Sequence, residues 1–259
     1  MAQKTIRSAS HRRTNDLVYQ LIADHLGESN RILDFGSGAG HMCQRLGNQV
    51  EAQGGTPSEQ IYACEINPEA FQYDKIPCQK ISSDSEIPFP DEHFDVIYAI
   101  EVIEHTPRPY DLFKIAYKKL RPGGKFLITT PNLLHMKSRI EYLFTGFGDM
   151  YPPPSSLEKN AGRICGHIMP LNLSYFAYGA RKAGFEEPVF HVDRRKRSSG
   201  FLATALWPLM KLSSALYDRK IRNYDLEDWN ENKRIIRQMN SFDLLTSRSC
   251  ILSMIKPSH

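Results

Sequence analysis

The chain has little cysteine and no long apolar run, and both features exclude several classes of protein. It holds five cysteines in 259 residues, an odd and widely spaced set without a C-x-x-C pair. This pattern argues against a disulfide scaffold and against a zinc or iron–sulfur site, and it is typical of reduced thiols in a cytoplasmic protein. The chain has no clean apolar stretch of about 18 residues, and its basic N-terminus lacks an apolar segment. We therefore expect neither a membrane span nor a signal peptide.

The excess of positive charge is also small. Thirty-three Lys and Arg residues face 29 Asp and Glu residues, a net charge of +4, which is too mild to argue for nucleic acid by itself. The basic run Arg194–Arg197 lacks the interleaved aromatic residues of a base-stacking surface. The N/D-P-P-Y/F motif of enzymes that modify amino groups of DNA and RNA is missing too, and Ala99–Val102 stands in its place. We therefore expect no nucleic-acid partner.

What the chain does have is a glycine-rich segment behind a short apolar run. Residues 31–35 are expected to form a buried strand, Gly36–Gly40 a turn with almost no side chains, and residues 41–50 an amphipathic helix. This order brings backbone N–H groups and a helix N-terminus close to a ligand. The glycines follow G-x-G-x-G with His41 at the sixth position, so the dinucleotide fingerprint G-x-G-x-x-G is not met. The P-loop pattern G-x-x-x-x-G-K-[ST] is also absent.

Apolar runs of strand length alternate with stretches of helical spacing. The strands are expected at residues 31–35, 60–64, 94–100, 125–130, 187–192 and 249–255. Further helices are expected at residues 14–26, 111–120, 136–144 and 173–184, with Thr14 or Asn15 capping the first. This alternation predicts an α/β fold, in which a parallel sheet carries helices on both faces.

Three segments fall outside that rhythm. Residues 1–13 are polar and basic, and we expect them to be mobile. Residues 145–166 hold several prolines and glycines without periodicity, which is typical of a lid or a disordered loop. Residues 197–243 are expected to form a helical insertion.

Polar side chains follow several expected strands at the edge where open α/β sheets bind ligands. The carboxylate of Asp34 can hold the amides of the glycine turn or reach a ligand amine. Glu65 ends the second strand, where it can accept hydrogen bonds from both hydroxyls of a ribose, and Ile66 can lie against an adenine face. Ser83 or Asp84 can accept a hydrogen bond from an adenine amino group.

These motifs resemble those of a known family. Asp34-x-Gly36-x-Gly38-x-Gly40 resembles motif I of the class I S-adenosyl-L-methionine (SAM) methyltransferases. The later run is similar to methyltransferases of ubiquinone and menaquinone biosynthesis and of polysaccharide gene clusters, at Ile87–Asp95, Glu101–His105, Leu120–Gly124 and Thr130–Asn132. The resemblance covers residues 31–132 well and continues weakly through His167–Leu171 and Ala183–Phe185.

The resemblance implies a Rossmann-like, doubly wound, mostly parallel sheet of seven strands that binds SAM and releases S-adenosyl-L-homocysteine. The implied cofactor-binding residues are Asp34, Gly36, Ser37, Gly38, Gly40, Glu65, Ile66, Ser83, Asp84 and Glu101. The family's acidic residue often falls where this chain has Ser83, one position before Asp84, so either can face adenine. We expect one domain over residues 1–259: a SAM-binding core at 14–132, an acceptor-side lid and helical insertion at 133–243, and a last strand and tail at 244–259.

Methyl transfer to a hydroxyl group requires a base, and histidine suits that role. His105 follows the central strand and is the first candidate; His167 is the second and His135 the third, although each can equally be a structural histidine. We expect no metal site, because Asp91, Glu92 and Asp95 are better interpreted as a polar turn and Glu101 with Glu104 as the start of a helix.

The sequence predicts O-methylation of a small or lipid-linked acceptor, such as a glycan or isoprenoid-like intermediate. N- or C-methylation of a small metabolite, or a SAM-binding module without turnover, are the alternatives. Within 194–222, an apolar segment that contains Trp207 is flanked by basic residues and should be kinked by Pro208. This segment either packs on the core as a lid or rests on anionic lipid as a peripheral membrane contact. The oligomeric state stays open.

Overall fold

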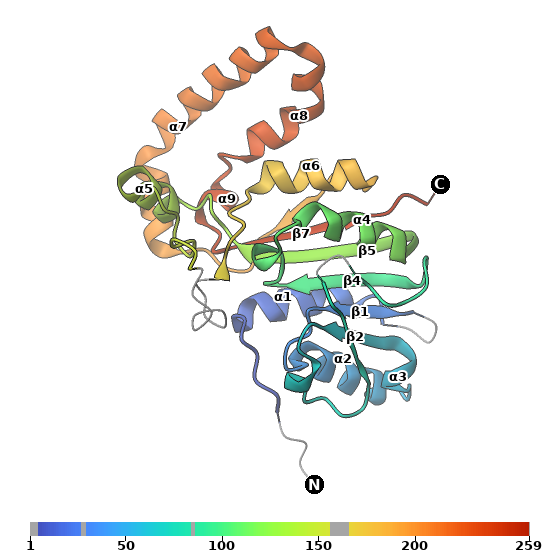
Figure 1. The fold of residues 1–259 in the computed structure, drawn as a ribbon. Coiled ribbons are helices and arrows are strands. Elements are labelled where there is room, and N and C mark those ends of the chain that lie inside the picture. Colours follow the sequence, from blue (N-terminus) through green and yellow to red (C-terminus); the bar gives the residue numbers. More distant parts are fainter. Residues whose placement is uncertain (1–4, 27–29, 84–85, 156–165, 259) are drawn as a thin grey trace. The chain divides into compact units, whose positions relative to one another are not determined.

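The computed structural model describes residues 5–26, 30–83, 86–155 and 166–258 (Figure 1). Its contacts divide the chain into two compact units. We call them the sheet unit (Met1–Thr130, Gly179–His191 and Ile251–His259) and the helical unit (Pro131–Tyr178 and Val192–Cys250). Gly179–His191 belong to the sheet unit, although they fall within the expected acceptor-side segment 133–243.

A seven-stranded sheet forms the centre of the sheet unit, in the order β3-β2-β1-β4-β5-β7-β6 (Figure 1). The strands are β1 (Ile32–Phe35), β2 (Ile61–Glu65), β3 (Cys78–Lys80), β4 (Phe94–Ile100), β5 (Leu120–Pro131), β6 (Val189–His191) and β7 (Ser249–Ile255). The pairs β1–β2, β1–β4, β2–β3 and β4–β5 are parallel, whereas β6 and β7 are antiparallel. The mostly parallel, doubly wound fold is confirmed. The pattern of apolar runs missed β3, because it is three residues long and two of them are exposed.

Alternate residues of the strands face two different helical layers, as the two-residue period of a strand requires. One face packs against α1 (Arg12–Ala23) and α2 (His41–Ala52), with Ile32, Val96 and Leu127 in the shared core. On the other face, the ring of Phe113 from α4 (Pro109–Lys119) meets that of Phe126 edge-on at 5.8 Å. Helices therefore cover both faces and leave the strand ends for ligands.

The N-terminal segment differs from our expectation of a mobile tail. Ile6 is buried, and its backbone N–H donates a 2.9 Å hydrogen bond to Oε1 of Gln44 in α2. The cap of α1 also differs, since the side chain of His11, rather than Thr14 or Asn15, accepts the hydrogen bond from Arg13 N. Both expected caps are buried within the helix, which therefore begins earlier than its polar residues suggest.

Short elements join the strands at both edges of the sheet, and those that follow a strand lie at the ligand edge. A four-residue helix, α3 (Pro57–Gln60), leads into β2, and one-turn 3₁₀ helices follow β2 at η1 (Pro68–Ala70) and β4 at η2 (Ile103–His105). The parallel strands β1, β2 and β4 thus deliver their C-terminal ends, and the turns behind them, to one edge.

The expected helical insertion is present in the helical unit. The helical unit contains α5 (Met136–Thr145), the start of α6 (Leu173–Ala183), α7 (Arg197–Tyr224), α8 (Leu226–Gln238) and α9 (Phe242–Thr246). The last three of these helices form the insertion. The helix α7 runs through Pro208 as one element of 28 residues, and it forms a hairpin with α8 (Figure 1). No helix among the described residues has the length and apolarity needed to cross a membrane.

Candidate active site

The glycine turn after β1 needs glycine for two separate reasons. Gly36, Gly38 and Gly40 all have positive φ angles, of 74°, 51° and 86°, which side chains disfavour. A Cβ atom at Gly36 would lie 2.6 Å from Val102, and one at Gly40 would lie 2.7 Å from the ring of Phe71. A Cβ atom at Gly38 would meet nothing within 4 Å. Neighbouring side chains therefore leave no room for a Cβ atom at Gly36 or Gly40, whereas Gly38 presents bare backbone to open space.

The carboxylate of Glu65 ties this turn to the end of β2. Its Oε2 accepts a 2.8 Å hydrogen bond from Gly38 N, and its Oε1 accepts one of 2.7 Å from Ile66 N. Because β1 and β2 are parallel neighbours with Phe35 opposite Cys64, the turn and Glu65 emerge side by side. The expected cofactor residues Gly38, Glu65 and Ile66 are thus brought together by the sheet.

Asp34 lies behind the turn rather than on its surface. Its side chain is buried and accepts a 3.3 Å hydrogen bond from the thiol of Cys43 in α2. Burial raises the pKa of Asp34 to about 7, although that hydrogen bond opposes the rise. Asp34 therefore changes charge near neutral pH, at the base of the glycine turn.

This raised pKa makes a prediction about stability. The folded protein retains the Asp34 proton up to about pH 7, whereas the unfolded chain releases it near pH 4, so stability should fall between these values and then level off. Because asparagine does not ionise, Asp34→Asn should remove this fall in stability. We expect the variant to match wild type at pH 4 and to exceed its free energy of unfolding at pH 8 by as much as about 4 kcal/mol. Urea unfolding across this pH range measures the difference, and parallel curves for the two proteins would contradict it.

The other described cofactor candidates after β1, β2 and β3 lie on the same edge. Ile66 is apolar yet 56% exposed, so its side chain is available to a flat ligand. Ser83 follows β3, whose Lys80 pairs with Glu65 of β2, so it lies beyond the C-terminal end of β3, on the same edge as Glu65. Asp84, the alternative adenine contact, lies outside the described residues. Ser37 is in the turn, where its hydroxyl lies 3.5 Å from the thiol of Cys78.

Two carboxylates follow β4, and burial distinguishes them. Glu101 has a positive φ of 54°, and its Oε1 accepts a 3.0 Å hydrogen bond from Thr129 Oγ1. Glu104 is buried within η2; burial, together with the charge of Glu101, raises its pKa well above the usual range, against a hydrogen bond with Thr130. The sequence predicts both at the start of a helix; Glu104 does lie in the one-turn helix η2, where it is buried. Burial therefore favours the neutral acid of Glu104.

The first candidate base, His105, ends η2 and is exposed. Its backbone N–H donates a 3.0 Å hydrogen bond to Val102 O, and a Cβ atom at Gly36 would touch the side chain of that same Val102. His105 therefore belongs to the turn that packs on the glycine segment, as expected from its position after the central strand.

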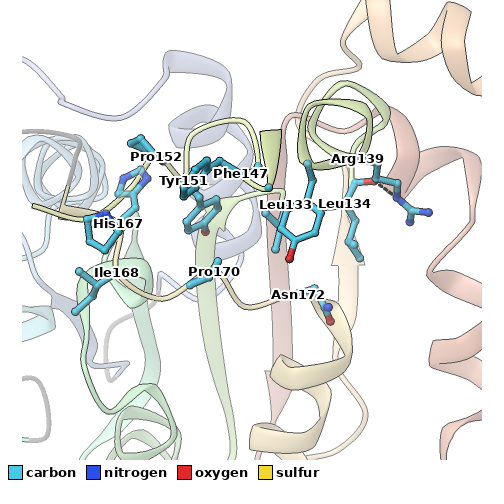
Figure 2. A pocket seen from close by; sticks show the side chains of 14 residues that line it. Leu133, Leu134, Arg139, Phe147, Tyr151, Pro152, His167, Ile168, Pro170 and Asn172 are labelled. Atoms are coloured by element: carbon cyan, nitrogen blue, oxygen red, sulfur yellow. Dashed lines mark hydrogen bonds between the residues drawn. The ribbon is translucent and has the colours of Figure 1, made fainter. Parts of the chain in front are cut away.

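The helical unit contains a pocket of its own, of about 620 Å³. Figure 2 shows His167 and Ile168 at one end and Arg139 at the other, with Phe147 and Tyr151 between them. Most of the other lining residues are apolar, namely Leu133, Leu134, Pro152, Pro154 and Pro170. A volume of this size suits a small organic molecule or one section of a longer chain. The sequence could place the pocket in 133–243 but could not name its residues, because this segment has no recurrent motif.

The geometry of His167 fixes which ring nitrogen carries its proton. Nδ1 lies 2.6 Å from the backbone carbonyl oxygen of Met150, and a carbonyl oxygen can only accept. Nδ1 must therefore donate, and the neutral ring keeps its lone pair on Nε2. The ring is mostly buried and tilts against that of Tyr151 at 5.5 Å. Such a ring is held in the state that can accept a proton at Nε2.

Arg139, at the other end of the pocket, is already engaged by the protein. Its guanidinium donates hydrogen bonds to Leu134 O at 2.7 Å, Asn240 Oδ1 at 2.6 Å and Met239 O at 2.5 Å. Burial lowers its pKa to about 10, which leaves it charged at neutral pH. Arg139 therefore joins α5 to the end of α8, and apolar groups dominate the remaining pocket surface.

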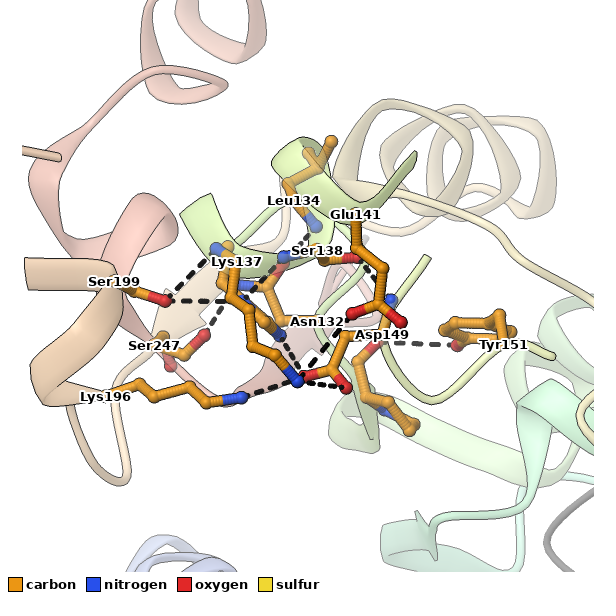
Figure 3. A network of polar contacts seen from close by, with 12 residues as sticks. Asn132, Leu134, Lys137, Ser138, Glu141, Asp149, Tyr151, Lys196, Ser199 and Ser247 are labelled. Atoms are coloured by element: carbon orange, nitrogen blue, oxygen red, sulfur yellow. Dashed lines mark hydrogen bonds and ion pairs between the residues drawn. The ribbon is translucent and has the colours of Figure 1, made fainter. Parts of the chain in front are cut away.

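His135, the third candidate base, has a structural role. It is buried at the start of α5, and its Nδ1 accepts the cap hydrogen bond from Ser138 N at 3.2 Å. Its Nε2 lies 3.2 Å from Asp149 Oδ2, and Asp149 also pairs with Lys196 at 2.8 Å and Lys137 at 3.3 Å (Figure 3). Burial and the charge of Lys196 lower the pKa of His135 to about 4. This network joins α5 and α7 to the loop that carries Tyr151, and it removes His135 from the candidate bases.

The chain belongs to the class I SAM-dependent methyltransferases. A family model described as a methyltransferase domain matches residues 7–192, more than half of the chain. SAM is the cofactor of this family, and the ligand edge suits its nucleoside: Gly38 offers bare backbone, Glu65 offers a carboxylate and Ile66 an exposed apolar side chain.

Relatives and solved structures agree with this assignment. The chain is 27% identical to the 27-O-demethylrifamycin SV methyltransferase of Amycolatopsis mediterranei, over 70% of this chain and 62% of that protein. It is 30% identical to the ubiquinone biosynthesis O-methyltransferase of Nitrosococcus oceani, over 65% of this chain and 84% of the relative. A SAM-dependent methyltransferase from Archaeoglobus fulgidus shares the fold, with a TM-score of 0.55 and 15% identity over 93% of this chain and 94% of its own. The chain thus spans less than two thirds of the length of the rifamycin relative.

Proposed function

We propose that this protein transfers the methyl group of SAM to a hydroxyl oxygen of an acceptor with an apolar body, either a small molecule or a lipid-linked one. The observation that carries this proposal is the pocket of the helical unit, where aromatic, leucine and proline side chains surround one histidine with a defined tautomer. The names of the rifamycin and ubiquinone relatives, which both specify oxygen as the methylated atom, support the same choice.

The apolar lining defines what the pocket can hold. Phe147, Tyr151 and Ile168 remove apolar surface of a ligand from water, which favours binding by about 25 cal/mol for each Å² buried. Because Arg139 is committed to backbone and Asn240 oxygens, the pocket has little to offer a strongly anionic acceptor body. An aromatic ring or a section of an isoprenoid chain matches this surface.

SAM, when bound, supplies a methyl group that its sulfonium has already activated, so the protein's task is to orient the acceptor, exclude water and take up a proton. His167 suits the last task, because the Met150 carbonyl holds the proton on Nδ1, and the lone pair of the neutral ring, which can take up the hydroxyl proton, is therefore on Nε2. His105 is the alternative base, at the end of the turn that follows β4.

Two phenylalanines allow a matched test of the pocket. Phe147 lines it and is 43% exposed, whereas Phe144 lies on α5, is 81% exposed and does not line it. With apolar phenols and alcohols as acceptors, we expect Phe147→Ala to raise KM for the acceptor about tenfold, through lost apolar contact. Phe144→Ala should leave KM unchanged, and calorimetry should show the same SAM affinity for both variants.

The acceptor atom is tested with the same protein. Amines and alcohols built on one carbon skeleton are offered with methyl-labelled SAM, and mass spectrometry locates the label. Methylation of the alcohols supports the proposal, whereas preferential labelling of the amines or of carbon would overturn the choice of oxygen. Failure to bind SAM would overturn the function as a whole.

A further inference from the structure

The helix α7 carries a line of large apolar side chains that the rest of the helical unit leaves in solvent. Phe201, Leu209, Leu212 and Leu216 are 77%, 63%, 59% and 60% exposed. Together with the exposed Ala205, they are spaced by three or four residues and therefore share one face of the helix. We call these five residues the α7 stripe.

The stripe lies opposite the side of α7 that packs against its own unit. Ala203 is fully buried in a core with Met136 of α5 and Leu245 of α9, and Trp207 and Met210 pack against the same core. A rotation of 100° per residue places these inward positions on the far side of the helix from the stripe. The alternative prediction, in which Leu202, Leu206, Leu209 and Leu216 pack on the core, is therefore wrong for Leu209 and Leu216.

Basic residues lie at both ends of the α7 stripe, and the acidic residue of α7 is turned away from it. Arg197 precedes it, and the exposed Arg219 and Lys220 follow it. The one acidic residue of α7, Asp218, faces α8, where it accepts a 2.9 Å hydrogen bond from Trp229 Nε1. The outward face of α7 is therefore apolar in the middle and cationic at its ends.

The basic run before α7 contributes less than its sequence suggests. Arg194 pairs with Asp193 at 2.7 Å, Arg195 with Asp243 at 2.5 Å and Lys196 with Asp149 at 2.8 Å. These three cations are neutralised within the helical unit, so the charge available to a partner comes from α7 itself.

We propose that the outward face of α7 binds the surface of a membrane that contains anionic lipid. An amphipathic helix with an apolar stripe and flanking Lys and Arg lies in the plane of the interface, where its apolar side chains enter the acyl boundary and its cations meet the headgroups. The stripe from Phe201 to Leu216 is about 24 Å long at 1.5 Å per residue, so several turns insert together. Lys and Arg side chains at its ends can extend their charges to the headgroups while their stems stay apolar.

Charge favours lipid over a second copy of the chain. Two α7 stripes packed face to face would place Arg197, Arg219 and Lys220 of one copy near the same residues of the other, in either direction of packing, and like charges repel. An anionic lipid surface instead neutralises each of them, at about 1 kcal/mol for every basic residue near the surface.

The test uses the full-length protein and co-sedimentation with vesicles of phosphatidylcholine alone or mixed equally with phosphatidylglycerol, at low salt. We expect wild type to bind the mixed vesicles and to bind the neutral ones much more weakly. Leu209→Ser combined with Leu216→Ser removes two side chains from the stripe, and Arg219→Gln combined with Lys220→Gln removes two charges. Each double variant should weaken binding to the mixed vesicles by about 30-fold.

Tyr175→Ser combined with Val189→Ser provides the control, because these side chains are 51% and 46% exposed but lie outside α7. This control should bind as wild type does. Absence of wild-type binding to the mixed vesicles, equal binding to neutral ones, or equal loss in the control would overturn the proposal. So would sedimentation showing a wild-type dimer that the Leu209 and Leu216 changes dissociate, together with no vesicle binding. Methylation of a water-soluble acceptor, measured in parallel, is expected to be the same in every variant, so the proposed reaction is judged separately.

Discussion

Gly38→Ala is expected to lower the affinity for SAM by at least about 100-fold while leaving the protein folded. Gly38 has a φ of 51° and faces open space, since an added Cβ atom would meet nothing within 4 Å. The added methyl group therefore clashes with no protein atom, and it projects into the space that the bare backbone of the turn leaves for the cofactor. Close approach of backbone to ligand is the property that only glycine supplies here.

Gly54 is a matched control for the cost of the backbone conformation. It has a φ of 82°, and its Cβ atom would also meet nothing within 4 Å, but it lies in the loop after α2, away from the glycine turn. Gly54→Ala and Gly38→Ala should each lower the free energy of unfolding by about 1 kcal/mol, because both force alanine into the left-handed region. Only Gly38→Ala should affect calorimetric SAM binding.

The comparison of these two variants separates strain from ligand contact. Equal SAM affinity in both would show that Gly38 does not face the cofactor, and the assignment of the turn would be wrong. A large loss of stability in Gly38→Ala alone would instead indicate an unforeseen clash within the fold. Gly40→Ala cannot replace this test, because its Cβ atom would meet the ring of Phe71 at 2.7 Å and unfolding would accompany any loss of binding.

The cofactor edge could be predicted from the sequence because its parts are local. A strand, a glycine turn and a helix are contiguous in the chain, and parallel strands must deliver their C-terminal ends to one edge. Pairing of β1 with β2 in register therefore brings Gly38 and Glu65 together, while Asp34 lies buried behind the turn. The burial of Asp34 and the bonding of Glu65 to Gly38 depend on three-dimensional packing, which no local pattern records.

The pocket could not be predicted because its residues share no period or motif. The pocket is lined by residues from separate turns and helix ends, among them Leu133, Phe147 and His167. What these residues share is their place around the pocket, which exists only in the folded protein. The network around Asp149 illustrates the cause: it collects Lys137 from α5, Lys196 from the start of α7 and the buried His135. Charges that are separated by about sixty residues of sequence thus fix the loop that carries Tyr151.

The α7 segment was ambiguous for a related reason. Its sequence places leucines at helical spacing within a mostly apolar segment. Such an apolar face can be covered by the chain's own core or left for a partner. Ala203 decides which face of α7 points inward, because this small residue allows α7 to approach α5 and α9 closely on one side. That close approach turns Leu212 and Leu216 to the other side.

His167→Gln is expected to lower kcat by about 100- to 10,000-fold, the usual contribution of a positioned base, with the affinity for SAM unchanged. Glutamine is a neutral, polar side chain of similar length, but it offers no basic nitrogen to the acceptor. His105→Gln is the parallel variant, because it removes the other candidate from the turn after β4. A larger loss of kcat in His105→Gln than in His167→Gln would transfer the role of base to His105, whereas unchanged kcat in both variants would show that methyl transfer by this protein requires neither histidine as a base.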